Sequence, residues 1–490
     1  PQNPPGFPSS GMTLLSWLTL DDLGVGTTLD NGNDCWGYVS PSGREYALMG
    51  HSHGTTFVEV TDPANPVILE LIHGPVSLWR DIKVYQSYAY AVSEGGDGIQ
   101  VIDMSEIDNG VVTFITNITT GGGSDSHNVA IDTDSGFLYR CGGTSSDGLR
   151  IYDLANPANP VWVAEWDDRY VHDAQVVTYD SGPYAGRQIA FACGGANGGW
   201  VDTGLDILDV TDKGNIILLS NTLYPDNEYS HQAWLSEDKQ YLYLNDELDE
   251  GTLGIPTTTF VFDVSDLSVP FLANTFTNGL PAVGHNLYVK GDLIFEANYK
   301  SGLRVFDAGV DPLDPPEVAF FDTWEEDDEV GSSGLWSNYP FLPSGTILGS
   351  DRNRGLFVLS LFQDCNDNGI DDALDISSGE SQDCNENSVP DECDIEQGTS
   401  SDDNGNEIPD ECECDPWVRG ETNGDGSVDI GDSVYLLSHL FQSGAPPDPM
   451  EAGDINADSS VNVADAVYML NYLFGDGDPP PAPFPDPDCP

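Results

Sequence analysis

The sequence predicts a mainly β protein: a seven-bladed β-propeller closed by an N-terminal strand, followed by a calcium-binding, loop-rich segment and a small α-helical domain. Three observations predict it. A repeat of about 40 to 50 residues, the usual length of a four-stranded blade, runs from Trp36 to Leu361. Short apolar segments start at the same relative position in each copy of that repeat. Acidic residues and cysteines then become denser from Asp364 onward. An eight-bladed ring or a pair of β-sandwiches is the alternative.

Turn residues mark the end of the third strand in the repeats. An aspartate, often followed by Asn or Pro, reverses the chain before the outer strand, because its side chain caps turn amides and proline presets φ. These aspartates are Asp62, Asp103, Asp153, Asp209, Asp263 and Asp307.

Seven innermost strands are expected, and they begin near Trp36, Arg80, His127, His172, His231, His285 and Ser337. The seventh repeat supplies only three strands before the chain leaves it at Leu361. The alternating segment from Met12 to Leu20 is the candidate fourth strand, and its pairing would close the ring and remove exposed edges. We therefore assign residues 12–361 to the propeller and residues 1–11 to an N-terminal extension.

Several strings in this region resemble the secreted LVIVD-repeat proteins called the choice-of-anchor B family. The matching strings are Arg80–Val84, His172–Val176, His231–Leu235, Asn245–Glu250 and Trp336–Pro340. The resemblance implies a surface-exposed propeller joined to variable anchoring modules. It brings no catalytic residue with it.

The charge of the chain limits its partners. The 490 residues include 83 acidic and 15 basic ones, a formal net charge of −68, which argues against binding the phosphate backbone of nucleic acids. No apolar run approaches the roughly 18 residues that a membrane-spanning helix needs. Calcium ions and basic partners are the species expected to neutralise such a charge.

Four histidines share one position in the repeat, just before an apolar strand: His127, His172, His231 and His285. In a closed ring they would converge on one mouth of the channel, where imidazole suits zinc or iron. Two other interpretations stay open. The histidines could bond within their own blades as structural residues, or they could contact an unknown ligand directly.

The same mouth is expected to collect further chemistry-bearing residues. Candidate catalytic residues are His172, Asp173, Asp246 and Glu247, with Arg80, Asp81, Cys141, Cys193, His51 and His53 nearby. The run from Asn245 to Glu250 holds four carboxylates, which suits a solvated loop, calcium binding or general acid–base work. No nucleophile elbow, phosphate loop or metalloprotease motif is present in the sequence.

Residues 362–415 contain a 19-residue repeat with oxygen-bearing side chains at alternate positions. Such spacing wraps Ca²⁺, whereas an acidic disordered linker would not explain the periodic cysteines. The expected ligands are Asp364, Asn366, Asn368, Asp383, Asn385, Asn387, Asp402, Asn404 and Asn406. The segment resembles thrombospondin type 3 repeats, which are calcium-filled, disulfide-tied spacers, although Leu374 and Asp403 stand where a regular array carries cysteine. The six cysteines from Cys365 onward indicate disulfides in an oxidising compartment, with their pairing open.

Residues 416–475 contain a loop and helix duplicated with a period of 33. Both loops match the positions of an EF-hand-like calcium site. The first set is Glu421, Asn423, Asp425, Ser427, Asp429 and Asp432, and the second is Asp454, Asn456, Asp458, Ser460, Asn462 and Asp465. Amphipathic helices are expected over Asp432–Phe441 and Asp465–Phe474.

A duplicated loop that ends in Asp and leads into one helix resembles a type I dockerin. That resemblance implies folding on calcium and docking onto a cohesin-like or other cell-surface protein. Two residues depart from the pattern, Glu421 at the first position and Ser459 at the turn glycine. The recognition positions carry Ile430–Gly431 and Val463–Ala464 in place of a hydroxyl pair. Residues 476–490 form a Pro-rich tail.

Together these features predict a secreted or cell-surface calcium-binding protein. Its propeller would bind an unknown ligand at the histidine-lined mouth, with calcium modules as stalk and anchor. A metal-dependent extracellular hydrolase of polysaccharide or another polymer is the first alternative. A purely structural assembly protein is the second.

Overall fold

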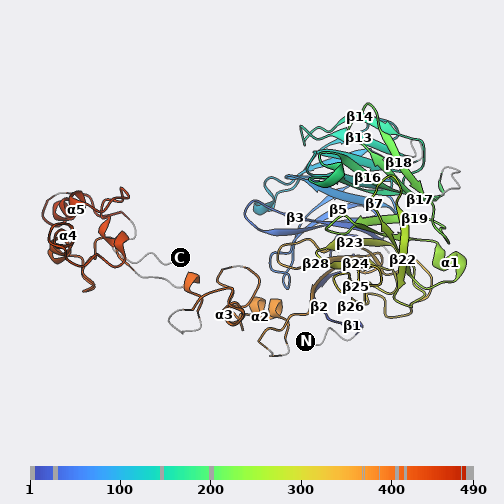
Figure 1. Cartoon of the computed structure of the whole chain (residues 1–490). Coiled ribbons are helices and arrows are strands. Elements are labelled where there is room, and N and C mark those ends of the chain that lie inside the picture. Colours follow the sequence, from blue (N-terminus) through green and yellow to red (C-terminus); the bar gives the residue numbers. More distant parts are fainter. Residues whose placement is uncertain are drawn as a thin grey trace. The chain divides into compact units, whose positions relative to one another are not determined.

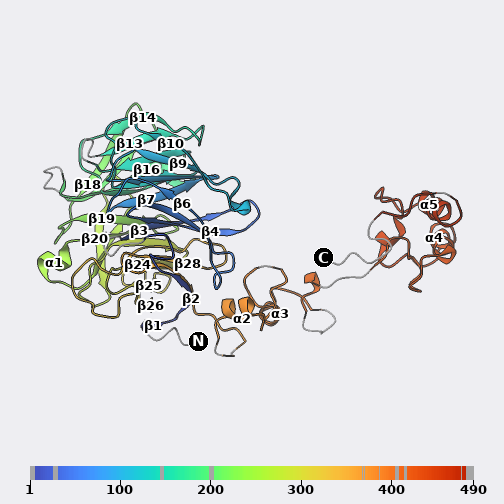
Figure 2. The same cartoon turned by 180° about the vertical axis from the view of Figure 1, so that it is seen from behind.

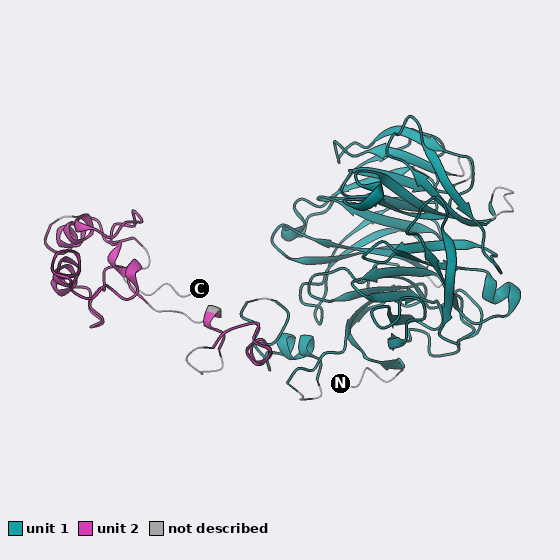
Figure 3. Ribbon diagram, viewed as in Figure 1, with its two compact units in different colours: residues 1–390 teal, residues 391–490 magenta. Residues whose placement is uncertain are grey.

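The computed structural model describes residues 6–25, 31–143, 148–197, 203–366, 368, 370–385, 387–402, 408–412, 417–475 and 477–481 (Figure 1). The chain divides into two compact units, residues 1–390 and 391–490 (Figure 3). The first unit holds the β-sheets, and the second holds the C-terminal helices.

Seven antiparallel sheets make up the first unit, so the predicted seven-bladed propeller is confirmed. Blade one is β3 (Gly32–Val39), β4 (Glu45–His51), β5 (Gly54–Glu59) and β6 (Val67–His73). Blade two is β7 (Arg80–Tyr85), β8 (Tyr88–Ser93), β9 (Ile99–Asp103) and β10 (Thr113–Ile118). Blade three is β11 (Asn128–Asp132), β12 (Phe137–Cys141), β13 (Leu149–Asp153) and β14 (Val161–Trp166). Blade four is β15 (Asp173–Thr178), β16 (Gln188–Gly194), β17 (Gly204–Asp209) and β18 (Ile217–Thr222).

Blades five to seven complete the ring. Blade five is β19 (Ser230–Leu235), β20 (Tyr241–Asp246), β21 (Thr258–Asp263) and β22 (Phe271–Thr277). Blade six is β23 (Asn286–Lys290), β24 (Leu293–Ala297), β25 (Leu303–Asp307) and β26 (Glu317–Phe321), with β1 (Ser9–Ser10) added at its outer edge. Blade seven is β27 (Leu335–Tyr339), β28 (Ile347–Asp351), β29 (Gly355–Leu361) and β2 (Met12–Leu18).

The ring closes through the N-terminal segment, as the sequence predicts. Strand β2, which is labelled in Figure 2, pairs antiparallel with β29, with Met12 opposite Leu361 and Leu18 opposite Leu356. Innermost strands of neighbouring blades contact one another around the ring, and β27 contacts β3. Strand β1, which pairs with β26, is an element that the sequence pattern does not predict.

The aspartates that follow the third strands accept hydrogen bonds from turn amides, as the sequence predicts. Asp103 accepts a hydrogen bond from the backbone N–H of Ser105 at 2.8 Å, and Asp153 accepts one from Ala155 at 2.7 Å. Asp263 does the same for Ser265 at 2.9 Å. These bonds stabilise the chain reversal because they satisfy turn amides that no strand partner reaches.

The hydrophobic core lies between successive blades. One cluster joins Leu48 and Phe57 of blade one to Ile82 and Ala91 of blade two, and all four are fully buried. Similar clusters fill the other inter-blade spaces. The two middle strands of a blade are therefore apolar on both faces, as strands buried on both faces must be.

The segment after β29 starts with the helix α2 (Asp372–Ser378), which packs against blade seven. The carboxylate of Asp371 caps α2 and accepts hydrogen bonds from the hydroxyls of Thr13, at 2.8 Å, and Ser360, at 3.1 Å. Leu374 packs on the apolar cluster of blades one and seven. Packing therefore explains why an apolar residue stands here in place of a cysteine.

The second unit contains the short helices α3 (Asp391–Gln397) and η4 (Asp410–Cys412), then α4 (Ile430–Gln442), η5 (Met450–Gly453) and α5 (Val463–Phe474). Helices α4 and α5 pack together over a small core of Leu436, Ile455, Ala466 and Met469, as their apolar stripes predict. Cys365, Cys384, Cys393 and Cys412 are disulfide-bonded, whereas Cys35, Cys141 and Cys193 are buried free thiols. Among the described residues, no helix is long and apolar enough to cross a membrane.

Candidate metal centre at one mouth of the propeller

The four histidines that share one repeat phase lie in a continuous row. Ring centroids are 4.1 Å apart for His127 and His172, 4.4 Å for His172 and His231, and 4.2 Å for His231 and His285. The row forms because each histidine precedes the innermost strand of a blade, or lies at its start, and neighbouring blades present that point side by side. The expected convergence is therefore present in the structure.

Backbone carbonyls fix the tautomers of two of these rings. The Nδ1 of His231 lies 3.1 Å from the carbonyl oxygen of His285, and the Nδ1 of His285 lies 2.6 Å from that of Trp336. A carbonyl oxygen can only accept, so each Nδ1 must carry the proton. Each neutral ring therefore presents a lone pair at Nε2.

The neighbouring His172 is held by a tyrosine. The hydroxyl of Tyr229 lies 2.8 Å from the Nδ1 of His172 and 3.3 Å from the Oδ1 of Asn197. A hydroxyl can donate or accept, so this contact positions the ring and is compatible with either tautomer. The Nε2 of His172 is buried and has no hydrogen-bond partner in the described structure.

Glu247 brings a carboxylate to these lone pairs. Its oxygens lie 3.7 Å from the Nε2 of His231 and 3.8 Å from the Nε2 of His285, which is too long for a hydrogen bond. Ligand atoms of His172, His231 and Glu247 all lie within 4.8 Å of one another. For comparison, two tetrahedral ligands about 2.1 Å from zinc stand about 3.4 Å apart.

Burial keeps these imidazoles neutral. Burial first, then the neighbouring His127, lowers the pKa of His231 to about 3. The pKa values of His172 and His285 are lowered well below the ordinary value, again by burial and then by nearby histidines. Neutral imidazole is the form that binds a metal. The Nε2 atoms of two neutral imidazoles thus lie beside the Glu247 carboxylate, with a nitrogen of His172 close by, a ligand set that suits a cation.

Further contacts hold the ligands and leave space beside them. Tyr299 donates to a Glu247 oxygen at 3.0 Å, and the Nδ1 of His127 lies 2.6 Å from a Glu94 oxygen. The mouth encloses a cavity of about 440 Å³. Its lining includes Trp79, Glu94, His127, His172, Glu247, Trp336 and Arg352. A substrate-sized space therefore adjoins the candidate ligands.

Other residues expected at this mouth have different surroundings. Asp246 is buried and accepts hydrogen bonds from the backbone N–H groups of Glu228, Tyr229 and Leu248 and from the Tyr224 hydroxyl, so it braces a turn. Asp173 lines a second cavity farther along the channel. Arg80 is buried, where it donates to backbone carbonyls of His51 and Pro75. None of Asp81, Cys141, Cys193, His51 and His53 is among the residues that line the histidine cavity.

A solvated loop over Asn245–Glu250 is not what the structure shows. Asp246, Asp249 and Glu250 are at most 1% exposed, and only Glu247 reaches the histidines. Burial raises the pKa values of the neighbouring Asp249 and Glu250 carboxyls, and Asp249 raises that of Glu250 further. The pair therefore holds a proton near neutral pH.

The two predicted calcium loops of residues 421–432 and 454–465 have the same internal geometry. Glu421 and Asn423 both accept from the backbone N–H of Asp425, at 3.0 and 2.9 Å, as Asp454 and Asn456 do from Asp458. The last loop residues, Asp432 and Asp465, are fully buried. Each completes a capping box at the start of its helix, α4 with Asp429 and α5 with Asn462. Ser427 and Ser460 occupy the position that ligates through its carbonyl oxygen.

The turn position distinguishes the two loops. Gly426 has φ +80° and Ser459 has φ +69°. A side chain in this left-handed region costs energy that glycine avoids. The second loop is therefore the strained one.

The first 19-residue repeat also folds as such a loop. Asp364 and Asn366 accept from the backbone N–H of Asn368 at 2.9 and 3.1 Å. Asp375, which the sequence analysis missed, lies 2.6 Å from the Asn368 side chain and is fully buried. It stands eleven residues after Asp364, the spacing of Asp432 from Glu421, so a search for a twelve-residue loop could find it.

In the second repeat, Asp383 and Asn385 accept from the N–H of Asn387 at 3.0 and 3.1 Å. Asp402 begins the third repeat, but Asn404 and Asn406 lie outside the described residues.

Comparison with known proteins identifies one domain. Residues 419–474 match the dockerin type I domain, a calcium-binding module. No curated protein matches the chain. Among solved structures, a protein from Lactobacillus plantarum is similar at 13% identity and a TM-score of 0.48, over 68% of this chain and 96% of that one. Hydrazine synthase of Kuenenia stuttgartiensis is similar at 12% identity and a TM-score of 0.46, over 66% of this chain and 95% of that one. The periplasmic gluconolactonase of Pseudomonas aeruginosa is similar at 13% identity and a TM-score of 0.44, over 61% of this chain and 85% of that one.

Proposed function

We propose that this protein is an extracellular, dockerin-anchored propeller that carries a transition-metal centre at one channel mouth. His172, His231, His285 and Glu247 would hold the ion, with zinc or iron the best-suited metals. The observation that carries the proposal is the position of one carboxylate, Glu247, which lies 3.7 and 3.8 Å from the Nε2 atoms of His231 and His285 and forms a group of ligand atoms within 4.8 Å with His172 and His231. Oxygen partners at Nδ1 hold the three rings in place, as the outer contacts of metal-bound histidines usually do.

The experiment is a metal titration of the full chain in excess calcium, so that the acidic C-terminal loops are already filled. Cobalt(II) serves as the probe, because a four-coordinate site gives it intense visible absorption. We expect one bound ion per chain, lost in His231→Gln and in Glu247→Gln. His73→Gln is the matched control, because His73 is exposed on the outer strand β6. Equal cobalt binding by wild type and both site variants would rule out the centre.

The dockerin domain supports an anchoring role outside the cell. Helices α4 and α5 expose apolar side chains in duplicate at a spacing of 33 residues: Ile430, Val434 and Phe441 on one, and Val463, Val467 and Phe474 on the other. Exposed apolar patches mark protein interaction sites. The proposed partner is a cohesin-like or other cell-surface protein with an apolar docking face.

The calcium ions of this anchor would be held by the two loops at 421–432 and 454–465. Those of the preceding stalk would be held by the aspartates and asparagines of the 19-residue repeats, with Asp375 as an added ligand. The predicted resemblance of that stalk to thrombospondin type 3 repeats remains part of this proposal. So does the resemblance of the propeller to the choice-of-anchor B family.

A metal-dependent hydrolase is the second candidate, because a cavity of about 440 Å³ adjoins the proposed ligands. A bound zinc ion would supply an activated water there. Glu94 and Arg352 line the same cavity and offer a base and a cation for a substrate. Turnover of polysaccharides or other polymers by the zinc-loaded chain, lost in Glu94→Gln while cobalt binding persists, would favour this candidate over a binding module.

A further inference from the structure

The second cavity of the propeller lies farther along the channel, among the innermost strands. Its volume is about 510 Å³, within the range of small-molecule sites. Its lining includes residues from the segments 36–39, 83–86, 130–134, 173–177 and 232–234, and residues 339 and 341. None of the proposed metal ligands lines it.

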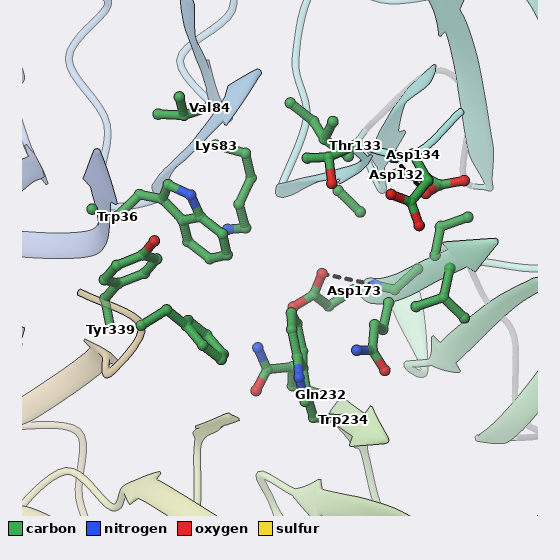
Figure 4. Close-up of a pocket in the computed structure, with 18 of the residues that line it drawn as sticks. Trp36, Lys83, Val84, Asp132, Thr133, Asp134, Asp173, Gln232, Trp234 and Tyr339 are labelled. Carbon is green, nitrogen blue, oxygen red and sulfur yellow. Dashed lines mark hydrogen bonds between the residues drawn. The ribbon is translucent and has the colours of Figure 1, made fainter. Parts of the chain in front are cut away.

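One wall of this cavity is aromatic. Trp36, Trp234, Tyr339 and Phe341 line it, and they come from blades one, five and seven. Ring centroids of Trp36 and Tyr339 lie 4.8 Å apart, and those of Tyr339 and Phe341 lie 5.3 Å apart. In Figure 4, Trp36 and Tyr339 stand together on one side of the space, and Trp234 lies beside Gln232 below it. The rings are partly exposed, so the wall is open to a ligand.

Beside these rings, the cavity offers hydrogen-bonding groups with fixed orientation. The Oε1 of Gln175 accepts from the backbone N–H of Leu235 at 2.9 Å, and the Oε1 of Gln232 accepts from that of Leu287 at 2.5 Å. A backbone N–H requires an oxygen, so both Nε2 groups are set as donors. Neither Nε2 has a partner in the described part of the chain. Asp173 adds a carboxyl oxygen to these groups (Figure 4).

Charge in the cavity disfavours an ionic ligand. The ammonium of Lys83 lies 2.6 Å from an Asp81 oxygen and 4.5 Å from the centroid of the Trp36 ring. A ligand cation would meet this ammonium, and a ligand anion would meet Asp134, which also lines the cavity. Asp132 is already satisfied by the hydroxyls of Ser135 and Thr178. A neutral ligand fits this balance best.

We propose that this cavity binds a single neutral sugar ring of a carbohydrate, with one face on the aromatic wall and its hydroxyls on Gln175, Gln232 and Asp173. A pyranose has an apolar C–H face, which suits stacking on an aromatic ring. Its hydroxyls both accept and donate, so they satisfy amide donors and a carboxyl acceptor together. An aromatic side chain of a peptide would leave those polar groups unpaired, which opposes its binding.

The test measures binding of D-glucose, D-galactose, D-mannose, D-xylose, cellobiose and xylobiose to the full chain by calorimetry and tryptophan fluorescence. We expect at least one of them to bind. Gln232→Glu keeps the oxygen that meets Leu287 and removes the donor, so it should weaken binding at least about tenfold. Gln240→Glu, the same change at an exposed site, should leave binding unaltered.

Trp234→Leu is the second variant, and it keeps the inference testable if Gln232→Glu does not fold. It should reduce the fluorescence response, because Trp36 is then the remaining tryptophan among the lining residues, and it should weaken binding by a similar factor. Binding of no sugar in the panel would overturn the inference. So would sugar affinity that is unchanged in both variants, or binding of N-acetyl-phenylalaninamide in place of every sugar. Gln232 follows His231 in the chain, but the side chains of Gln232 and Trp234 line this cavity and not the histidine cavity, so cobalt binding should persist in both variants, which separates this test from that of the metal centre.

Discussion

Replacing Tyr229 by phenylalanine tests the metal centre without touching a proposed ligand. Tyr229 contributes the oxygen that lies 2.8 Å from the Nδ1 of His172 and so holds that ring in place. Loss of such an outer hydrogen bond usually weakens metal binding by about 10- to 100-fold. That factor corresponds to about 1.4–2.7 kcal/mol. We expect the Tyr229→Phe variant to bind zinc more weakly by this factor.

The matched control is Tyr170→Phe. The Tyr170 hydroxyl lies 3.5 Å from the same nitrogen, at the limit of a hydrogen bond, so its removal should change zinc affinity by less than about threefold. The assay is competition with a chromophoric zinc chelator in calcium-saturated buffer. Equal affinities of Tyr229→Phe and wild type, or equal losses in the two variants, would refute the role assigned to Tyr229.

Three further predictions concern stability and calcium. Burial raises the pKa of Glu296 from 4.5 to about 7, so this carboxyl favours folding in its neutral form and stability should fall as pH rises from about 4.5 to about 7. Glu296→Gln should remove most of that loss of folding stability, which is about 3 kcal/mol above pH 7. Urea unfolding of wild type and variant at pH 4 and pH 8 checks this, and parallel pH profiles of the two proteins would count against it. Ser459→Gly should stabilise the second calcium loop by about 1 kcal/mol in calcium-dependent thermal unfolding. The control is Ser460→Gly, which changes a residue at an ordinary φ and should not stabilise the loop. Equal stabilities of the two variants would contradict the strain argument. Chelation of calcium should open residues 364–475 to proteolysis while the propeller stays folded, and equal resistance with and without chelator would contradict this.

The propeller can be predicted from the sequence because each blade repeats the same local pattern. Apolar strands bounded by turn aspartates such as Asp103 and Asp153 recur at blade spacing, and the ring then follows from the need to cover strand edges. Histidine phase likewise predicts convergence, because a closed ring places equivalent residues on one mouth. Strand β1 cannot be predicted in this way, because it has only two residues and so shows no periodic pattern.

The chemistry of the mouth depends on contacts that no spacing encodes. Glu247 and Asp246 are adjacent in the same acidic run, yet one faces the histidines and the other braces a turn. Which carboxylate turns inward is decided by the path of the chain from β20 into the helix α1 (Asp249–Leu253). The aromatic and polar walls of the second cavity are equally hidden, because they gather from blades far apart in sequence. The twelve-residue loop spacing predicts Asp375, whereas the 19-residue period by itself points only to the residues at the start of each repeat.

The most direct test of the metal centre is anomalous scattering from crystals of the full chain grown with calcium and zinc. Data collected on both sides of the zinc absorption edge distinguish zinc from calcium. The account predicts a zinc peak within bonding distance of Glu247 and the Nε2 atoms of His172, His231 and His285. Zinc peaks confined to the acidic C-terminal loops, with none at this mouth, would contradict it.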